Sequence, residues 1–240
     1  MSTTLLDKRE QRIRRMFGAI APTYDLLNHL LSLNIDRYWR WRTTRLVPPQ
    51  ADGPILDLCT GTGDLALAYA RAAGGRVPII GADFCGEMLD RAVRKTATRT
   101  AAGVVRYVQA DAQRLPFADD TFQIVCVAFG LRNITDTDRG LAEMVRVARP
   151  GGRVAVLEFS KPHNALLGRL YQFYFRRLLP LVGQAISRSQ DEAYKYLPES
   201  VQVFPDGEAL AERLRQHGLC AVWYKPFTFG IATLYVGTKP

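Results

Sequence analysis

A glycine-containing stretch in the first third of the chain has residue types suited to binding a ligand. Asp57-Leu58-Cys59-Thr60-Gly61-Thr62-Gly63-Asp64 follows a short apolar run and opens a helical pattern. Gly61 and Gly63 permit a tight turn and a close backbone approach, and the following helix presents unpaired N–H groups. The stretch predicts a strand-to-helix turn that binds a ligand, although a turn without a ligand would fit the same pattern.

Two further acids follow at spacings that suit a nucleoside. Asp83 lies 26 residues after Asp57, where a carboxylate can accept hydrogen bonds from both ribose hydroxyls. Asp111, followed by Ala112, ends the next apolar run. Each acid alone could cap a helix. If all three end parallel strands, they meet in one crevice, which predicts an adenosine-bearing cofactor.

The charges around the glycine turn bear on which cofactor this is. Asp57 and Asp64 flank the turn and would repel the pyrophosphate of a dinucleotide. Flanking acids suit a ligand with ammonium and sulfonium groups. We therefore expect S-adenosylmethionine.

The elements that must position these residues alternate in type. Strands are predicted at Pro54 to Leu58, Val77 to Asp83, Val104 to Gln109, Phe122 to Phe129 and Arg153 to Phe159. Helices are predicted at Asp64 to Ala73, Gly86 to Thr98, Asp138 to Ala148 and Asp206 to His217. This alternation indicates a doubly wound α/β core. Two last strands, Ala221 to Phe227 and Ile231 to Gly237, are joined too closely for a parallel crossover and should pair antiparallel.

The segments outside this core are helical or irregular. Residues 9–46 read as helices, and residues 161–200 interrupt the strand-helix alternation as a helical insertion after the fifth predicted strand. We expect one domain over residues 1–240, with residues 1–50 as a helical lid and residues 161–200 facing substrate and membrane. Tyr24 and Asn28, four apart on one helical face, would close over the cofactor.

Composition limits the classes of protein that fit. The 240 residues, 48% hydrophobic and 23% charged, suit one soluble domain, and no apolar run is long enough to span a bilayer. The net charge of +9 favours anionic partners, whether nucleic acid, lipid headgroups or a phosphorylated ligand. Four cysteines without a CxxC pair and three histidines without metal-ligand spacing predict no metal site and no disulfide. Without an export signal, a cytoplasmic protein is expected.

Several motifs carry a resemblance to known enzymes. The glycine turn, the three acids and Pro150-Gly151-Gly152 resemble the class I S-adenosylmethionine-dependent methyltransferases. Motifs at residues 24–28, 129–136, 146–160 and 194–200, among them Phe129-Gly130-Leu131-Arg132-Asn133, resemble the ubiquinone/menaquinone biosynthesis C-methyltransferase family. The resemblance implies a Rossmann-like, mostly parallel seven-stranded sheet with one antiparallel strand, and S-adenosylmethionine as cofactor.

The same resemblance implies a reaction. Residues 171–183 look more like the members that methylate demethylmenaquinol to menaquinol, the last step of menaquinone biosynthesis, than those that methylate a methoxy-polyprenyl-benzoquinol. Arg132 and Asn133 would stabilise and orient a quinol as it develops phenolate character. The cofactor would contact a set of loop and strand-end residues, namely Asp57, Gly61, Thr62, Gly63, Asp83, Asp111 and Ala112.

Three positions depart from the family pattern, and two other functions compete. Leu27 stands where the family usually has Met, Asp36 where it has His, and Ala128 where it has Ser. An RNA methyltransferase would suit the charge, but the chain shows no RNA-binding module, so nucleic acid is not the expected partner. A non-catalytic scaffold of a quinone-synthesis complex is the other alternative.

The expected partner is a polyprenylated quinol, and a homo-oligomer remains open. Because a polyprenyl quinol dissolves in lipid, we expect peripheral contact at the inner face of the membrane. Residues 166–182 are apolar and carry Arg169, Arg176 and Arg177, which would touch anionic headgroups.

Overall fold

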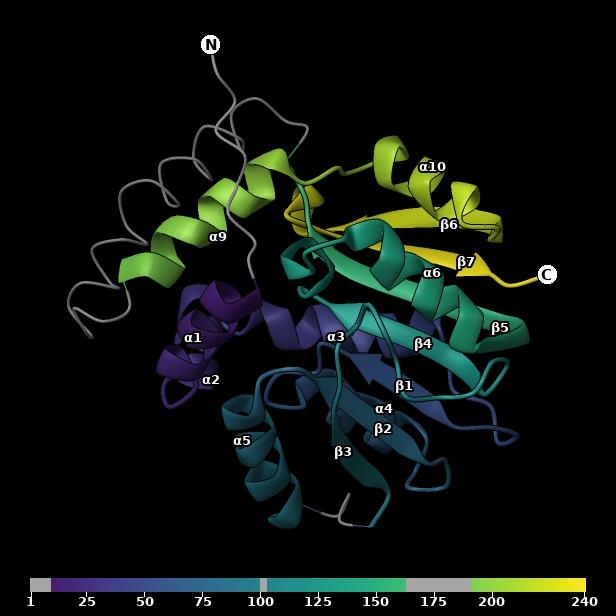
Figure 1. Cartoon of the computed structure of the whole chain (residues 1–240), viewed down its shortest axis with the longest axis horizontal. Coiled ribbons are helices and arrows are strands. Elements are labelled where there is room, and N and C mark those ends of the chain that lie inside the picture. The colour runs from purple at the N-terminus through teal and green to yellow at the C-terminus, as the bar shows by residue number, and fades with distance from the viewer. Residues whose placement is uncertain (1–9, 100–102, 163–190) are drawn as a thin grey trace.

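A seven-stranded sheet organises the protein in the computed structural model, which describes residues 10–99, 103–162 and 191–240 (Figure 1). The sheet order is β3-β2-β1-β4-β5-β7-β6. The strands are β1 (Ile55–Leu58), β2 (Ile79–Asp83), β3 (Val105–Gln109), β4 (Phe122–Ala128), β5 (Ala148–Phe159), β6 (Cys220–Phe227) and β7 (Ala232–Thr238).

The direction of the strands follows from the connections between them. β1 to β5 run parallel, whereas β7 pairs antiparallel with both β5 and β6. Only the short 3₁₀ turn Thr228–Gly230 joins β6 to β7, too little chain for a parallel crossover. The predicted doubly wound sheet with one antiparallel strand is therefore confirmed.

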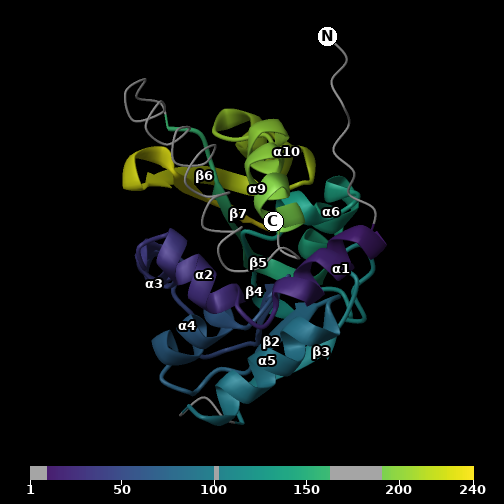
Figure 2. The ribbon, with the colours of Figure 1, turned by 90° about the vertical axis from the view of Figure 1, so that its left-hand side faces the viewer.

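The strands bury both faces of the sheet. Side chains alternate, so that Leu56 and Leu58 pack on one face under α6 (Thr137–Val147) and α10 (Glu208–Gln216). Ile55 and Ile124 pack on the other, under α3 (Ile35–Leu46) and α4 (Asp64–Ala72). Figure 2 shows the sheet between these two layers of helices. Burial on both faces explains the near-continuous apolar runs of the sequence.

Helices from both ends of the chain meet beside the sheet. α1 (Glu10–Ile20) packs against α5 (Gly86–Ala97) and α9 (Asp191–Val203), and α2 (Tyr24–Leu31) packs against α3. Pro22 lies in the turn that separates α1 from α2. α9 continues through Pro198, and its residues 191–200 belong to the helical insertion predicted at residues 161–200.

The largest difference from the predicted boundaries lies where α6 meets β5. The helix expected to reach Ala148 ends at Val147, and β5 begins at Ala148 rather than Arg153. Pro150 cannot continue a helix, and Ala148 instead pairs with Phe122 ahead of a register shift. The turn at Gly151 and Gly152 therefore belongs to the strand.

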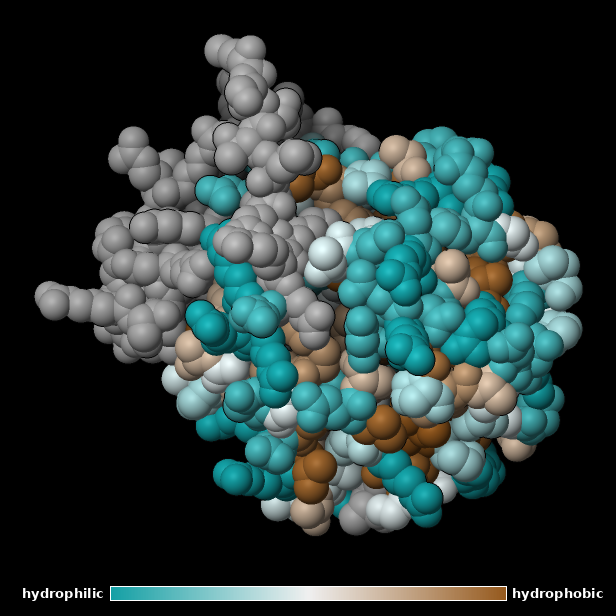
Figure 3. Space-filling view, viewed as in Figure 1, coloured by the Kyte–Doolittle hydropathy of each residue, from teal (hydrophilic) through white to brown (hydrophobic). Residues whose placement is uncertain are grey.

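The surface shown in Figure 3 is predominantly hydrophilic over α6 and α10. Within the described ranges, no helix is long and apolar enough to cross a membrane. The predicted membrane-facing stretch 166–182 lies outside the described residues, as does most of the predicted insertion 161–200.

Candidate active site

The glycine turn connects β1 to α4 at the carboxyl edge of the sheet. Its backbone has positive φ at Cys59 (51°), Gly61 (57°) and Gly63 (83°), a region that favours glycine. A Cβ at Gly63 would lie 2.3 Å from the Tyr107 hydroxyl, so only glycine fits there. The turn is thus held in a tight form.

Asp57 supports the turn from beneath. Its Oδ2 accepts a hydrogen bond from Thr60 Oγ1 at 2.6 Å and another from the Ala66 backbone N–H at 3.0 Å. The side chain is 1% exposed, and this burial raises the pKa of Asp57 to about 7. Asp57 therefore ties the turn to the first turn of α4.

Asp83 lies at the end of β2, level with the turn. Its two oxygens accept hydrogen bonds from the backbone N–H groups of Gly61 (2.8 Å) and Cys85 (2.9 Å). Burial raises the pKa of this carboxyl group, and the three backbone N–H bonds from Cys85, Gly61 and Phe84 oppose that shift. Asp83 both fixes the turn and forms part of a cavity wall.

That cavity, here called the loop pocket, brings the ends of four strands together. Asp83 and Asp111 lie in its wall with Gly61 and Ala112, so four of the seven residues expected to bind cofactor meet there. Asp57, Thr62 and Gly63, the other three, do not line this cavity. The remaining wall residues are mainly apolar and come from α1, α2, α5, the end of β4 and the segments that follow β1, β2, β3 and β4. They are Ile13, Phe17, Tyr24, Cys59, Phe84, Met88, Gln113, Ala128, Phe129, Gly130, Asn133, Ile134 and Thr135.

Sequence reasoning missed most of these apolar wall residues. Phe84 and Ile134 could have been found, because each directly follows a residue singled out for chemistry, Asp83 and Asn133. Ile13 and Phe17 could not, because their helical spacing fits any buried face. Only the packing of α1 onto α5 brings them over the strand ends.

A second cavity, here called the aromatic pocket, adjoins the loop pocket. The two share Phe17, Tyr24 and Phe129 in their walls. The rings of Trp39, Phe129 and Phe159 cluster at one side, with centroids 4.4 to 6.1 Å apart. The other wall residues are Met16, Ile20, Asn28, Ser32, Asp36, Arg40, Arg132, Tyr196 and Leu197. A flat, mostly apolar molecule could pack against this cluster of rings.

Tyr24 stands where the two pockets meet. It lies on α2 with Asn28 one turn later, as the sequence predicted, and its ring reaches within 4.0 Å of where a Cβ at Gly61 would be. Burial raises the pKa of Tyr24, while its hydrogen bond with Asn28 and the charges of Arg40 and Arg132 oppose the shift. The tyrosine therefore remains neutral and covers the glycine turn.

Arg132 is held in a buried ion pair in the wall of the aromatic pocket. Its Nη1 lies 2.9 Å from Glu158 Oε2, and the two side chains are 6% and 1% exposed. Nη1 also donates to the Phe129 carbonyl and Nε to Ser200 Oγ at 3.3 Å. The guanidinium is thus fixed in place and its charge is largely balanced before any substrate binds.

Two buried polar atoms face these pockets without a partner in the described structure. Asn133, whose residue lies in the wall of the loop pocket, has an unpartnered Oδ1. Tyr196, in the wall of the aromatic pocket, has an unpartnered hydroxyl and is 3% exposed. Leaving such groups unpaired is costly, so each marks a place for a polar group of a ligand.

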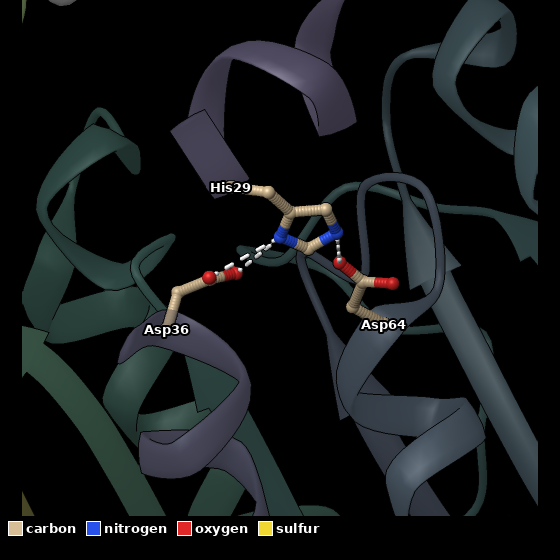
Figure 4. A group of neighbouring side chains, drawn as sticks. All are labelled: His29, Asp36 and Asp64. Carbon is tan, nitrogen blue, oxygen red and sulfur yellow. Dashed lines mark hydrogen bonds and ion pairs between the residues drawn. The ribbon is translucent and has the colours of Figure 1, made fainter. Parts of the chain in front are cut away.

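An ion-pair network borders the aromatic pocket (Figure 4). His29 Nδ1 lies 2.9 Å from Asp36 Oδ2, and His29 Nε2 lies 3.9 Å from Asp64 Oδ2. Arg40 pairs with Asp36, and Lys95 Nζ lies 2.8 Å from Asp64 Oδ1. The spacing of the three groups would admit a metal ion, but both acids already have cationic partners. His29 also places an imidazole beside Asp36. Position 36 is the one at which the family pattern has a histidine.

Comparison with known proteins identifies the family. The model of the ubiE/COQ5 methyltransferase family matches residues 5–239. The chain belongs to this family. It is 44% identical over 234 residues to the ubiquinone/menaquinone biosynthesis C-methyltransferase UbiE of Geobacter sulfurreducens, with 98% of this chain and 91% of that protein covered. It is 47% identical over 225 residues to the demethylmenaquinone methyltransferase of Thermus thermophilus, with 94% and 100% covered.

Solved structures agree with the family's fold. A possible histamine N-methyltransferase of Thermotoga maritima covers 95% of this chain and all of its own, with a TM-score of 0.66 and 16% identity. Haemonchus contortus phosphoethanolamine N-methyltransferase 2, solved with S-adenosyl-L-methionine, gives a TM-score of 0.59 at 17% identity, covering 82% of this chain and 51% of that one. As a member of the ubiE/COQ5 family, the protein is an S-adenosylmethionine-dependent methyltransferase.

The loop pocket fits this cofactor. Asp83 retains free lone pairs for a ribose diol, and Asp111 can accept from an exocyclic amine. The orphaned Asn133 Oδ1 offers an acceptor for an ammonium group. Gly130 keeps the pocket floor close to the turn, because a Cβ there would lie 2.4 Å from Cys59 Cβ.

Proposed function

We propose that the protein transfers a methyl group from S-adenosylmethionine to a ring carbon of demethylmenaquinol. One observation carries the proposal: an aromatic pocket with a fixed guanidinium and a free phenolic hydroxyl shares a wall with the pocket that fits the cofactor. A ring bound there lies beside the cofactor, as methyl transfer requires.

The aromatic pocket suits a hydroquinone. The rings of Phe129 and Phe159, 4.4 Å apart, offer a flat apolar surface for a bicyclic ring. The hydroxyl of Tyr196 and the amide of Asn28 offer hydrogen bonds to its oxygens. A pocket that fixes the orientation of a small ring is expected to have mostly apolar walls with a few polar groups.

The reaction needs electron density at a carbon beside a ring hydroxyl. When bound, S-adenosylmethionine supplies an activated methyl group on a sulfonium. Arg132 donates a hydrogen bond that strengthens as the hydroxyl becomes a phenolate, and Glu158 holds the guanidinium in position. Tyr24 and Asn28 cover the two pockets and exclude water. Asn133, which was expected to orient the quinol, lines the loop pocket and not the aromatic pocket, and there it would orient the cofactor's ammonium group.

The reaction balances with one proton released. The ring carbon would form a bond to the methyl group while the methyl–sulfur bond breaks and its electron pair stays on the sulfur, which leaves as a neutral thioether. The ring carbon then loses its hydrogen as a proton, so the ring undergoes no net oxidation. The substrate must therefore be the reduced quinol, because the oxidised quinone lacks the hydroxyl that supplies electron density.

Demethylmenaquinol is the preferred substrate of two. Relatives from Thermus thermophilus and Deinococcus radiodurans are named for demethylmenaquinone, at 47% and 43% identity. The relative from Geobacter sulfurreducens is named for both quinone pathways, so a methoxy-polyprenyl-benzoquinol is the alternative substrate.

A methyl-transfer assay with labelled S-adenosylmethionine tests the proposal. Purified protein should label short-tailed demethylmenaquinol kept reduced, label the benzoquinol less, and label bulk RNA not at all. The oxidised demethylmenaquinone is the matched control and should accept no label. Labelling of RNA alone would favour the RNA rival, and no transfer with tight cofactor binding would favour the scaffold.

The whole chain is proposed to work as one methyltransferase domain. In this arrangement residues 1–50 act as the helical lid and residues 161–200 face the substrate. Because a polyprenyl quinol resides in the bilayer, the protein works as a peripheral enzyme at the inner membrane face. A homo-oligomer is compatible with this arrangement.

A further inference from the structure

Half of the large apolar side chains exposed in the described residues lie within one short stretch. Of ten such side chains, five lie between residues 26 and 41, namely Leu26, Leu30, Leu33, Tyr38 and Trp41. Their exposed fractions range from 47% for Tyr38 to 78% for Leu33. Single exposed leucines are ordinary, but a group on one helical hairpin marks a surface that meets another apolar phase.

The hairpin of α2 and α3 has two faces with different surroundings. Tyr24 and Asn28 lie in the wall of the aromatic pocket. Leu26 and Leu30, two positions further along, point about 200° away around the helix. The apolar face is therefore separated from the pocket by about one helix diameter, roughly 10 Å.

A basic groove, here called the arginine groove, adjoins this hairpin. It runs between α3 and α4, which lie side by side in Figure 2. Four exposed arginines line it, namely Arg37, Arg45, Arg71 and Arg99, and none of the four forms an ion pair within the described residues. Trp41 lies in the same wall, with its ring 5.9 Å from that of Tyr38.

The groove carries more positive charge than its wall balances, because Asp64 is the one acidic residue among its wall residues and already pairs with Lys95. Burial lowers the pKa of Arg71, the charges of Arg99 and Arg37 lower it further, and Asp64 opposes them. Arginines that repel one another in this way are stabilised by an external anion.

We infer that the α2–α3 hairpin and the arginine groove form a docking surface for an anionic lipid bilayer. The inference rests on the proposed function, since it places a lipid-soluble quinol beside its pocket. Leu26 and Leu30 insert at the boundary between the lipid headgroups and the acyl chains. Tyr38 and Trp41 lie at the level of the headgroups. The groove's arginines bind lipid phosphates.

Nucleic acid suits this surface less well. Its phosphates would satisfy the arginines, but it would leave the leucines of α2 in water. A bilayer matches both halves of the surface, the apolar face and the cationic groove. The leucines therefore decide between the two partners.

Vesicle co-sedimentation tests the inference with two variants. Neutral vesicles and vesicles with about one-third anionic lipid are compared. Replacing Arg37, Arg45 and Arg71 by Gln should weaken binding to the anionic vesicles roughly a hundredfold. The double variant Leu26→Gln/Leu30→Gln should weaken binding at least about tenfold on the same vesicles.

Matched controls carry the same changes elsewhere. These are the exposed triple Arg91→Gln/Arg106→Gln/Arg139→Gln and the exposed double Val93→Gln/Trp223→Gln, which should bind within about threefold of the wild type. Binding unchanged in both surface variants overturns the inference. The inference is also overturned if the protein binds RNA or inorganic phosphate more tightly than vesicles, with an affinity that depends on the arginines but is unchanged in the Leu26→Gln/Leu30→Gln variant.

An assay without vesicles distinguishes a failure of this inference from a failure of the proposed function. Methyl transfer to a short-tailed, water-soluble demethylmenaquinol without vesicles tests the chemistry alone. Both surface variants should retain that activity, because none of their substituted residues lies in the wall of either pocket. They should lose activity only on long-tailed quinol presented in vesicles.

Discussion

A substitution of Arg132 alone would change both catalysis and stability, because Arg132 forms a buried ion pair with Glu158. The loss of stability can be predicted quantitatively. Arg132→Met leaves Glu158 as a carboxylate that is 1% exposed. Two backbone donors remain on it, the N–H groups of Arg132 (3.3 Å) and Phe159 (3.0 Å). Breaking a buried pair costs about 3 to 5 kcal/mol, and these donors favour the lower end.

The loss appears directly as a lower melting temperature. For a protein of this size each kcal/mol shifts Tm by about 2 to 4 °C, so Arg132→Met should melt roughly 6 to 12 °C below the wild type. The double variant Arg132→Met/Glu158→Gln removes the buried charge and should recover most of that stability. An exposed pair is the matched control: Arg213→Met breaks a 2.7 Å contact with Asp138 and should shift Tm by less than about 3 °C.

Catalysis should not recover with stability. In the double variant kcat should stay roughly a hundredfold to a thousandfold low, because the hydrogen bond to the developing phenolate is still missing. Its Kd for S-adenosylmethionine should stay within about threefold, because Arg132 lies outside the loop pocket wall. Circular dichroism, methyl transfer and calorimetry measure the three quantities. A double variant with full turnover would remove Arg132 from the mechanism, and a single variant as stable as wild type would refute the burial argument.

Three further substitutions test the cofactor side of the site. Asp83→Asn weakens the hydrogen bonds available to a ribose diol and should raise the Kd for S-adenosylmethionine by roughly tenfold to a hundredfold; calorimetry with an unchanged Kd would contradict the ribose role. Gly130→Ala puts a Cβ 2.4 Å from Cys59 Cβ and should lower Tm, and Cys59→Gly on the same chain should restore part of the loss, unlike a control Cys220→Gly. Because burial raises the pKa of Asp57 to about 7, its contribution to stability is fully present below pH about 4 and is lost as the pH rises through 7. Asp57→Asn should therefore flatten the decline in denaturant midpoint between pH 5 and 8; an equal decline in both proteins would mean that Asp57 stays ionised.

Local signals predicted the framework of the site. The alternation of strands and helices predicted the sheet, because a fully buried strand has an apolar sequence whichever element it packs against. Gly61, Asp83 and Asp111 were found because turn geometry and strand ends constrain residue type at fixed spacing. Tyr24 and Asn28 fell on one helical face because their spacing matches the helix period.

Other features depended on contacts between distant segments. The ion pair of Arg132 with Glu158 joins the segment after β4 to the end of β5. The sequence around neither residue predicts this pair. The aromatic pocket needs Trp39, Phe159 and Tyr196 from three separate elements. Asp57 looked like a ligand contact, and only the fold put it beneath the turn.

The sequence by itself determined the sheet, the glycine turn, the acids at the strand ends and the family, because each depends on residues close together in the chain. The tertiary structure decided which side chains share a cavity and which charges are balanced. Those properties depend on distances between segments far apart in sequence. The same distinction applies to the docking surface. Periodicity makes α2 amphipathic, but only the packing of α3 on α4 brings together four arginines that form no ion pair within the described residues.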